Sequence, residues 1–361
     1  MHGVFCLHQL DTRAERTEYS PVHTPRLRKG SMRIARHTFL KGIGAAAASV
    51  TMDTRTDAQS VQRVDVHHHF ASPEWTAMLR AQNQFVPPWT RYSLNSDLEE
   101  LIRTGTRAML SVTTPGLWFG NAAAARRLAR ECNEYAAGLV RDHRAQFGFF
   151  VALPLPDVAG SLQEIAYGFD ILKADGVGLF TSYEGKWLGD PSFDPVFEEL
   201  NRRRAVVFVH PTTAPCCVNL QRGVSDATIE YGTDTTRAIA EMMISGASSR
   251  YKDVRIIFSH AGGTMPFLEG RFIHLLERYK KIAPDGFLAE ARRFYYDVAQ
   301  AAFPAPMAAL LKVIPVSHVL FGTDYPYFGV TETVESLRAC GVFSARDLAA
   351  IDHTNATALF D

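Results

Sequence analysis

The chain has 361 residues, of which 47% are hydrophobic and 21% are charged, and its formal net charge is zero. This composition can supply a large apolar core and excludes an intrinsically disordered chain. The balanced charge gives no electrostatic support for nucleic-acid binding, and no run of about 18 apolar residues is present. We therefore expect neither a nucleic-acid partner nor a membrane span.

Residues 1–60 lack the periodicity of strands or helices over most of their length, and we interpret them as a disordered N-terminal extension. Within them, the basic segment Arg36–Lys41 precedes Gly42–Val50, which is rich in Ala and Gly. This order is similar to a twin-arginine export signal, except that His37 occupies the place of the second arginine. Two localisations follow: a cytoplasmic enzyme domain, or periplasmic export directed by a degenerate signal at residues 36–50.

Strand-like and helical segments alternate from residue 63 to the end of the chain. Eight mostly continuous apolar runs are typical of strands buried on both faces: Arg63–Phe70, Arg107–Thr113, Phe147–Leu153, Gly176–Thr181, Ala205–His210, Val254–His260, Phe294–Val298 and Val319–Asp324. Helical patterns separate them at Asn121–His143, Ser161–Ala174, Asp194–Arg204, Asp234–Ser249, Met265–Lys281, Pro306–Val313 and Thr331–Cys340.

This alternation predicts an α/β fold, a (β/α)₈ barrel of the TIM type, over residues 61–361. An open, doubly wound sheet is the structural alternative. No Gly-x-Gly-x-x-Gly follows the first strand, which removes the usual nucleotide-binding version of that alternative.

Residues that bind metals or move protons end four of the eight predicted strands. They are the run His67–His69, then His210, His260 and Asp324. The C-terminal ends of barrel strands face the active site. Since alternate side chains of a strand share a face, His67 and His69 should point into the barrel mouth and His68 outward. With His210 and Asp324 they offer three nitrogens and one oxygen, a set that suits Zn²⁺ first and Mn²⁺ second.

Four segments carry these residues, and their order matches that of a known family. They are Val64–Phe70 (VDVHHHF), Phe208–Pro211 (FVHP), Phe258–Gly263 (FSHAGG) and Phe321–Pro326 (FGTDYP). On these motifs residues 63–361 resemble the amidohydrolase-related family, in the branch of the 2-amino-3-carboxymuconate-6-semialdehyde, γ-resorcylate and 6-methylsalicylate decarboxylases. The stretch Tyr183–Pro191 (YEGKWLGDP) is most similar to the 6-methylsalicylate group.

The resemblance implies one divalent metal ion bound by His67, His69, His210 and Asp324, with His260 as the acid–base residue beside it. Binuclear members bridge two metals with a carboxylated lysine on the fourth strand. Gly176–Thr181 contains no lysine, so we expect a single ion. We expect no organic cofactor, because the metal and an aromatic ring can hold the electrons of the reaction.

The resemblance also implies a homodimer. In the carboxymuconate-semialdehyde decarboxylase, the arginine that matches Arg271 reaches into the neighbouring subunit and grips the substrate carboxylate. Arg271 lies down the predicted helix from His260, away from its own barrel mouth. The alternative is a surface arginine paired with Glu269 or Glu277. Trp187 is an aromatic candidate for the wall of the substrate site.

We therefore expect a non-oxidative decarboxylase of an aromatic or unsaturated carboxylic acid, in particular a salicylate-type acid. The proton would come from His260 or Asp324, and the sequence leaves this choice open. The alternatives are a hydrolase that uses the same metal site on a lactone or amide, and a non-catalytic barrel that binds a metabolite. The complete ligand set argues against the last of these.

Overall fold

The computed structural model describes residues 63–85 and 87–360. The expected N-terminal extension and the export signal at residues 36–50 lie outside these residues. None of the described helices is both long and apolar enough to cross a membrane.

Eight parallel strands form one sheet, in the order β1, β2, β3, β4, β7, β8, β9, β10. Their bounds are β1 (Arg63–His69), β2 (Thr106–Ser111), β3 (Phe147–Ala152), β4 (Gly176–Phe180), β7 (Val206–His210), β8 (Arg255–Phe258), β9 (Tyr295–Asp297) and β10 (Val319–Leu320). The segment after β10 pairs with β1: Val66 N donates to Phe321 O at 3.0 Å, and Asp324 N donates to His67 O at 2.8 Å. These bonds close the sheet, and the predicted TIM-type barrel is confirmed.

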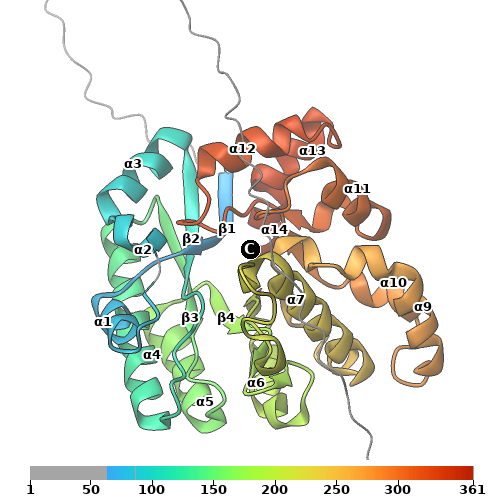
Figure 1. The fold of residues 1–361 in the computed structure, drawn as a ribbon, viewed down its shortest axis with the longest axis horizontal. Coiled ribbons are helices and arrows are strands. Elements are labelled where there is room, and N and C mark those ends of the chain that lie inside the picture. Colours follow the sequence, from blue (N-terminus) through green and yellow to red (C-terminus); the bar gives the residue numbers. More distant parts are fainter. Residues whose placement is uncertain (1–62, 86, 361) are drawn as a thin grey trace, which may run out of the picture. The chain divides into compact units, whose positions relative to one another are not determined.

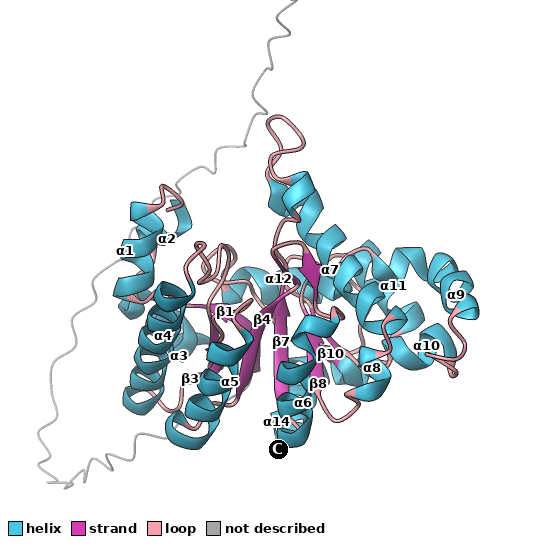
Figure 2. Cartoon of the chain, turned by 90° about the horizontal axis from the view of Figure 1, so that it is seen from below, coloured by secondary structure: helices cyan, strands magenta, loops and turns pink. Residues whose placement is uncertain are grey.

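Helices surround the strands (Figure 1), which lie between them in Figure 2. Seven helices correspond to predicted ones: α4 (Ala122–Asp142), α5 (Val158–Tyr167), α6 (Asp194–Arg203), α7 (Asp226–Ile244), α9 (Glu269–Arg278), α11 (Pro304–Val313) and α12 (Val330–Ala339). Polar caps define several starts; for example, the Asn121 side chain accepts from Ala124 N at 2.9 Å.

Seven α-helices and one β-hairpin of the described residues were not predicted. They are α1 (Pro73–Ala81), α2 (Pro87–Arg91), α3 (Leu94–Thr104), α8 (Ala247–Arg250), α10 (Gly286–Ala291), α13 (Ala345–Ala349), α14 (Asn355–Phe360) and the hairpin strands β5 (Ser182–Tyr183) and β6 (Lys186–Trp187). Most of them are only one or two turns long, and a short segment gives little periodicity to detect.

A β-bulge interrupts β1 just before the histidines. Asp65 pairs with Ala108 and His68 with Leu110, so three steps along β1 match two along β2. The extra residue lets Val66 and His67 both face the barrel interior. There Val66 packs in one cluster with Phe208, and the ring centroids of His67 and Phe208 lie 4.9 Å apart.

Two of the predicted strand ends that carry candidate site residues are wrong. β8 ends at Phe258 and β10 at Leu320, so His260 and Asp324 lie beyond the strands. Both residues have left-handed backbone, with φ of 53° and 67°. Non-glycine residues rarely adopt this conformation, and it is retained mainly where the surrounding structure holds a side chain at a functional site.

Candidate active site

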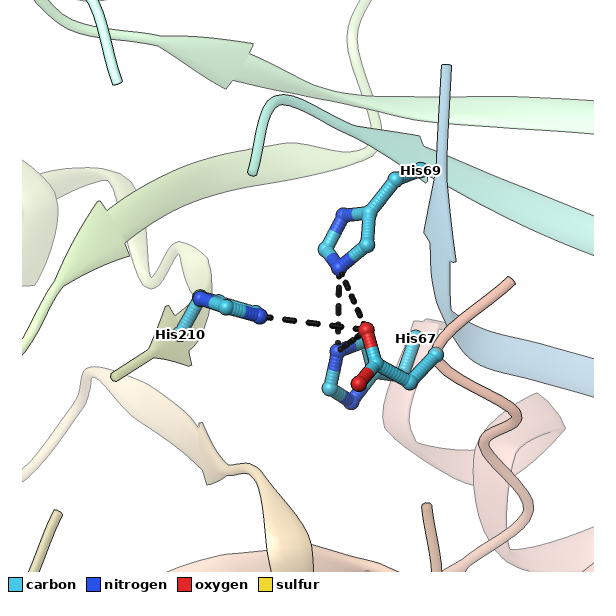
Figure 3. Close-up of side chains that lie close together, drawn as sticks. His67, His69 and His210 are labelled. Atoms are coloured by element: carbon cyan, nitrogen blue, oxygen red, sulfur yellow. Dashed lines mark hydrogen bonds and ion pairs between the residues drawn. The ribbon is translucent and has the colours of Figure 1, made fainter. Parts of the chain in front are cut away.

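Four side chains from three parts of the barrel converge at its C-terminal end. Asp324 Oδ1 lies 3.0 Å from His69 Nε2, 3.2 Å from His67 Nε2 and 3.9 Å from His210 Nε2. All four residues are buried, and their ligand atoms lie within 4.8 Å of one another. Figure 3 shows the three imidazole rings pointing toward one another. The predicted ligand residues are therefore brought together.

Each imidazole is held through its other nitrogen. The partners of the Nδ1 atoms are Asp297 Oδ2 for His67 (2.8 Å), Ser111 Oγ for His69 (2.9 Å) and Pro211 O for His210 (2.8 Å). Oxygen acceptors at Nδ1 place the hydrogen there and leave the Nε2 lone pairs facing the centre.

Three imidazole nitrogens and a carboxylate oxygen converge in a buried space, where a cation, either a proton or a metal ion, must lie between them. The residues thus fit one divalent ion, with a nitrogen-rich donor set that suits Zn²⁺ or Mn²⁺. At the end of β4 the chain has Thr181, whose hydroxyl hydrogen-bonds the Asp234 carboxylate, so no lysine offers a bridge to a second ion. Among the described residues, these four form the one group of this kind.

Burial and neighbouring carboxylates give the three ligand histidines different pKa values. Burial lowers the pKa of His69 to about 4 and that of His210 to about 3, so both rings are neutral near pH 7. Burial also opposes a charge on His67, but the Asp297 and Asp324 carboxylates outweigh it and raise its pKa to about 10. Without a metal ion, His67 therefore carries a proton that the ion must displace.

Metal binding is expected to release about one proton per ion near neutral pH. Because the pKa of His67 is raised to about 10, the proton is bound throughout the range below that value, and the apparent metal affinity should rise about tenfold per pH unit from pH 6 to 9. Titration calorimetry of the metal-free protein in two buffers with different ionisation enthalpies measures the released protons. A metal affinity independent of pH over this range contradicts the assignment.

Asp297 is a site residue that the sequence reasoning missed. One carboxylate oxygen faces His67 Nδ1 at 2.8 Å, and the other accepts from His260 N at 2.8 Å. A single side chain thus orients a metal ligand and the acid–base candidate. The available signal was its place near the end of the predicted strand Phe294–Val298. Gly322 passes close by: a Cβ there would lie 2.9 Å from the Cβ atoms of both Asp297 and His67, so only glycine fits.

His68 points away from the metal ligands, as predicted. Its Nδ1 lies 3.0 Å from Asp65 Oδ2, its Nε2 lies 3.1 Å from Asp97 Oδ1 on α3, and its ring stacks on Tyr325. Burial opposes its charge, yet the Asp97 and Asp65 carboxylates raise the pKa of His68 to about 10. A buried imidazolium thus joins α3 to β1 behind the site.

Two adjoining cavities open at this end of the barrel. One, of about 670 Å³, is bordered by His210 and Asp324 together with Thr113, Thr114, Tyr231 and Tyr327. The other, of about 780 Å³, is bordered by His260. The first is larger than a one-ring acid and borders two of the four ligand residues, so it is the candidate substrate space.

The two residues predicted to bind substrate lie elsewhere in this chain. Trp187 is part of the β5–β6 hairpin, where its Nε1 donates to Asp234 Oδ1 at 2.9 Å, and it borders neither cavity. Arg271 lies in the first turn of α9, is exposed, and makes no ion pair with the described residues. Neither side chain contacts the four ligands.

The amidohydrolase family model matches residues 64–361. The chain belongs to the amidohydrolase family. A decarboxylase of Aspergillus niger, yanB, is 38% identical over 308 residues, which cover 79% of this amidohydrolase and 83% of the relative. The 6-methylsalicylic acid decarboxylase acuB of Aspergillus aculeatus is 38% identical over 279 residues, covering 73% and 84%.

A solved structure shows the same fold. The dihydroxybenzoic acid decarboxylase of Polaromonas, with bound manganese and the inhibitor 2-nitroresorcinol, aligns with a TM-score of 0.72 at 20% identity. The alignment covers 82% of this amidohydrolase and 96% of that chain. Relatives in sequence and in fold are thus decarboxylases, and the expected branch of the family is confirmed.

Proposed function

We propose that this enzyme is a metal-dependent, non-oxidative decarboxylase of an aromatic acid of the salicylate type. The observation that carries the proposal is the buried set of three Nε2 atoms and one carboxylate oxygen, with His260 Nε2 3.3 Å from the other oxygen of Asp324. Sequence relatives named as 6-methylsalicylic acid decarboxylases support the substrate class. Zn²⁺ is our first choice of ion on the donor set, and Mn²⁺, which a structural neighbour holds, is the second.

In the reaction the bond between the ring and the carboxylate breaks, its electron pair stays with the ring carbon, and that carbon takes one proton as carbon dioxide leaves. A divalent ion held by His67, His69, His210 and Asp324 would supply positive charge for the substrate carboxylate and for the charge that develops. The chain itself must supply the proton and keep the substrate in place.

The carboxylate of Asp324 is a poor proton donor. Burial raises its pKa, but the charge near it on His67 and the hydrogen bond from His260 hold the pKa of Asp324 well below its usual value. We therefore propose that His260, which borders the adjoining cavity of about 780 Å³ and contacts the outer oxygen of Asp324, delivers the proton.

An assay of product type tests the function. Metal-loaded protein is given salicylate, 6-methylsalicylate and 2,6-dihydroxybenzoate, and in parallel a set of lactones and amides. Equal amounts of carbon dioxide and phenol from at least one acid are expected. Release of an acid from a lactone or amide, without carbon dioxide from any substrate, would establish the hydrolase alternative instead.

We further propose that the enzyme is a homodimer. Six large apolar side chains are exposed on segments that follow β7, β8 and β9: Val218, Leu220, Val224, Ile229, Phe267 and Phe303. Phe267 is 88% exposed and borders one cavity together with Ile229. Exposed apolar side chains that lie together commonly mark protein interfaces. Arg271 follows four residues later and has a free guanidinium among the described residues, which supports a role across the interface.

Arg271→Ala is expected to raise the Michaelis constant while leaving folding and metal content unchanged. A guanidinium binds a carboxylate through two parallel hydrogen bonds. Loss of the guanidinium should therefore weaken substrate binding more than it affects folding or metal binding. Mixing Arg271→Ala with His260→Ala subunits should restore activity, because one hybrid site holds both intact residues. Arg278→Ala, an exposed arginine on the same helix, is the control. A fully active monomer in dilute solution contradicts the proposal.

For localisation we propose a cytoplasmic enzyme domain, with export by residues 36–50 as the competing outcome. Residues 32–60 are fused to a reporter that folds before transport, both as they stand and with His37→Arg, which restores the paired arginines. A reporter that stays in the cytoplasm in both fusions supports our assignment. Transport that improves with His37→Arg shows that the segment is a signal.

A further inference from the structure

Asp324 presents its two carboxylate oxygens to different groups. Oδ1 faces the three ligand nitrogens, whereas Oδ2 lies 3.3 Å from His260 Nε2 and accepts a hydrogen bond from the side-chain amide of Gln300. Gln300 therefore contacts a metal ligand from the side opposite the metal. Neither the fold nor the reaction derived above accounts for it.

The backbone at Gln300 is held in an uncommon conformation. It follows β9 by three residues and has a φ of 51°, in the left-handed region that a glutamine rarely adopts. The turn is fixed on both sides of the strand end, because Val298 N donates to Leu320 O and Ala299 N donates to Asp297 Oδ1. Such conformations are retained where they aim a side chain at a functional site.

Gln300 also stands between the two cavities. Ala227, Tyr231 and Gln300 border both of them, and of these three only Gln300 makes a hydrogen bond to a metal ligand. One of its two amide N–H groups is used by Asp324. The other N–H and the carbonyl oxygen make no hydrogen bond with the described residues, and the side chain is exposed at the cavity mouth.

We propose that Gln300 is a positioning and specificity-determining residue of the decarboxylase. One amide N–H holds Asp324 Oδ2 turned away, so that Oδ1 alone faces the ligand nitrogens. The free amide oxygen accepts a hydrogen bond from a hydroxyl group on the ring of the substrate. The enzyme thus distinguishes a hydroxylated aromatic acid from its methyl ether, which has no hydrogen to donate. This inference rests on the proposed function.

Two variants separate these roles. Gln300→Met keeps the length of the side chain and removes every hydrogen bond, whereas Gln300→Glu keeps an acceptor but cannot donate to Asp324. The control is Gln163→Met, an exposed glutamine on α5. For each protein, kcat and KM are measured on a hydroxybenzoate and on its methyl ether. Metal per chain is measured by elemental analysis, and the affinity for 2-nitroresorcinol, an unreactive hydroxylated ring, by calorimetry.

Both Gln300 variants are expected to keep one ion per chain and to lower kcat by about tenfold or more, since each loses a hydrogen bond to a charged group. Gln300→Met should in addition lower the affinity for 2-nitroresorcinol by about tenfold. It should also reduce the preference for the hydroxylated acid over its methyl ether. Unchanged analogue affinity, or loss of the metal together with activity, would overturn the inference. If the wild-type protein releases no carbon dioxide, the proposed function is overturned but the role of Gln300 is not. That role is still tested by the binding of 2-nitroresorcinol.

Discussion

Substituting Asp324→Ala is expected to abolish decarboxylation and to remove the metal ion from the purified protein. Asp324 supplies the one negatively charged ligand, and its Oδ1 lies within 3.9 Å of all three histidine Nε2 atoms. Loss of a residue that merely orients a ligand weakens metal binding by about 10–100-fold, and loss of the ligand itself should exceed that range.

Elemental analysis and competition with a chelator measure this change. Asp142→Ala, an exposed aspartate on α4, is the matched control and should keep one ion per chain. Two ions per wild-type chain, with activity that follows the second, would contradict a mononuclear site. An Asp324→Ala protein that keeps its ion and its activity would show that another group completes the ligand set.

Removing the His260 imidazole should leave the metal bound and lower kcat by about 10²–10⁴-fold, the usual contribution of a general acid–base group. The physical reason is its position: His260 Nε2 faces Asp324 Oδ2, the oxygen turned away from the ligand nitrogens, and lies outside the metal-binding set. His260→Asn is the better variant, because asparagine tolerates the left-handed backbone at this position more readily than alanine.

His274→Ala, an exposed histidine on α9, serves as the control. The readouts are turnover, metal content and thermal unfolding, so that loss of chemistry is separated from loss of fold. Unchanged turnover in His260→Asn would show that His260 is structural and that Asp324 or a water molecule moves the proton.

Much of the fold could be read from hydrophobic periodicity. Strands such as Phe147–Ala152 are continuous apolar runs because helices cover the barrel on one side and packed side chains fill it on the other. The prediction was weakest where periodicity is short or broken. It missed α1 to α3, which lie between β1 and β2, and it extended the strands before His260 and Asp324 past the point where the backbone turns left-handed.

The ligand histidines and Asp324 could be identified from sequence because residue type and a place at or just beyond a strand both depend on local sequence. Asp297 and Gln300 could not, since their importance comes from what they touch: His67 in one case and Asp324 in the other, each separated by many residues along the chain. Trp187 shows what the sequence could not tell about a predicted side chain. An indole in a loop suggests a wall for an aromatic ligand, but its N–H is bonded to Asp234 of α7.

The sequence by itself thus determined the alternation of strands and helices, the barrel, and the four residues that offer metal ligands, because each depends on the chemistry and spacing of neighbouring residues. Only the tertiary structure decided how the sheet closes, where the β1 bulge places His67, which buried carboxylates charge His67, and how burial leaves His69 and His210 neutral. These features depend on distances between segments far apart in the chain, and burial and Coulombic forces act through space rather than along the sequence.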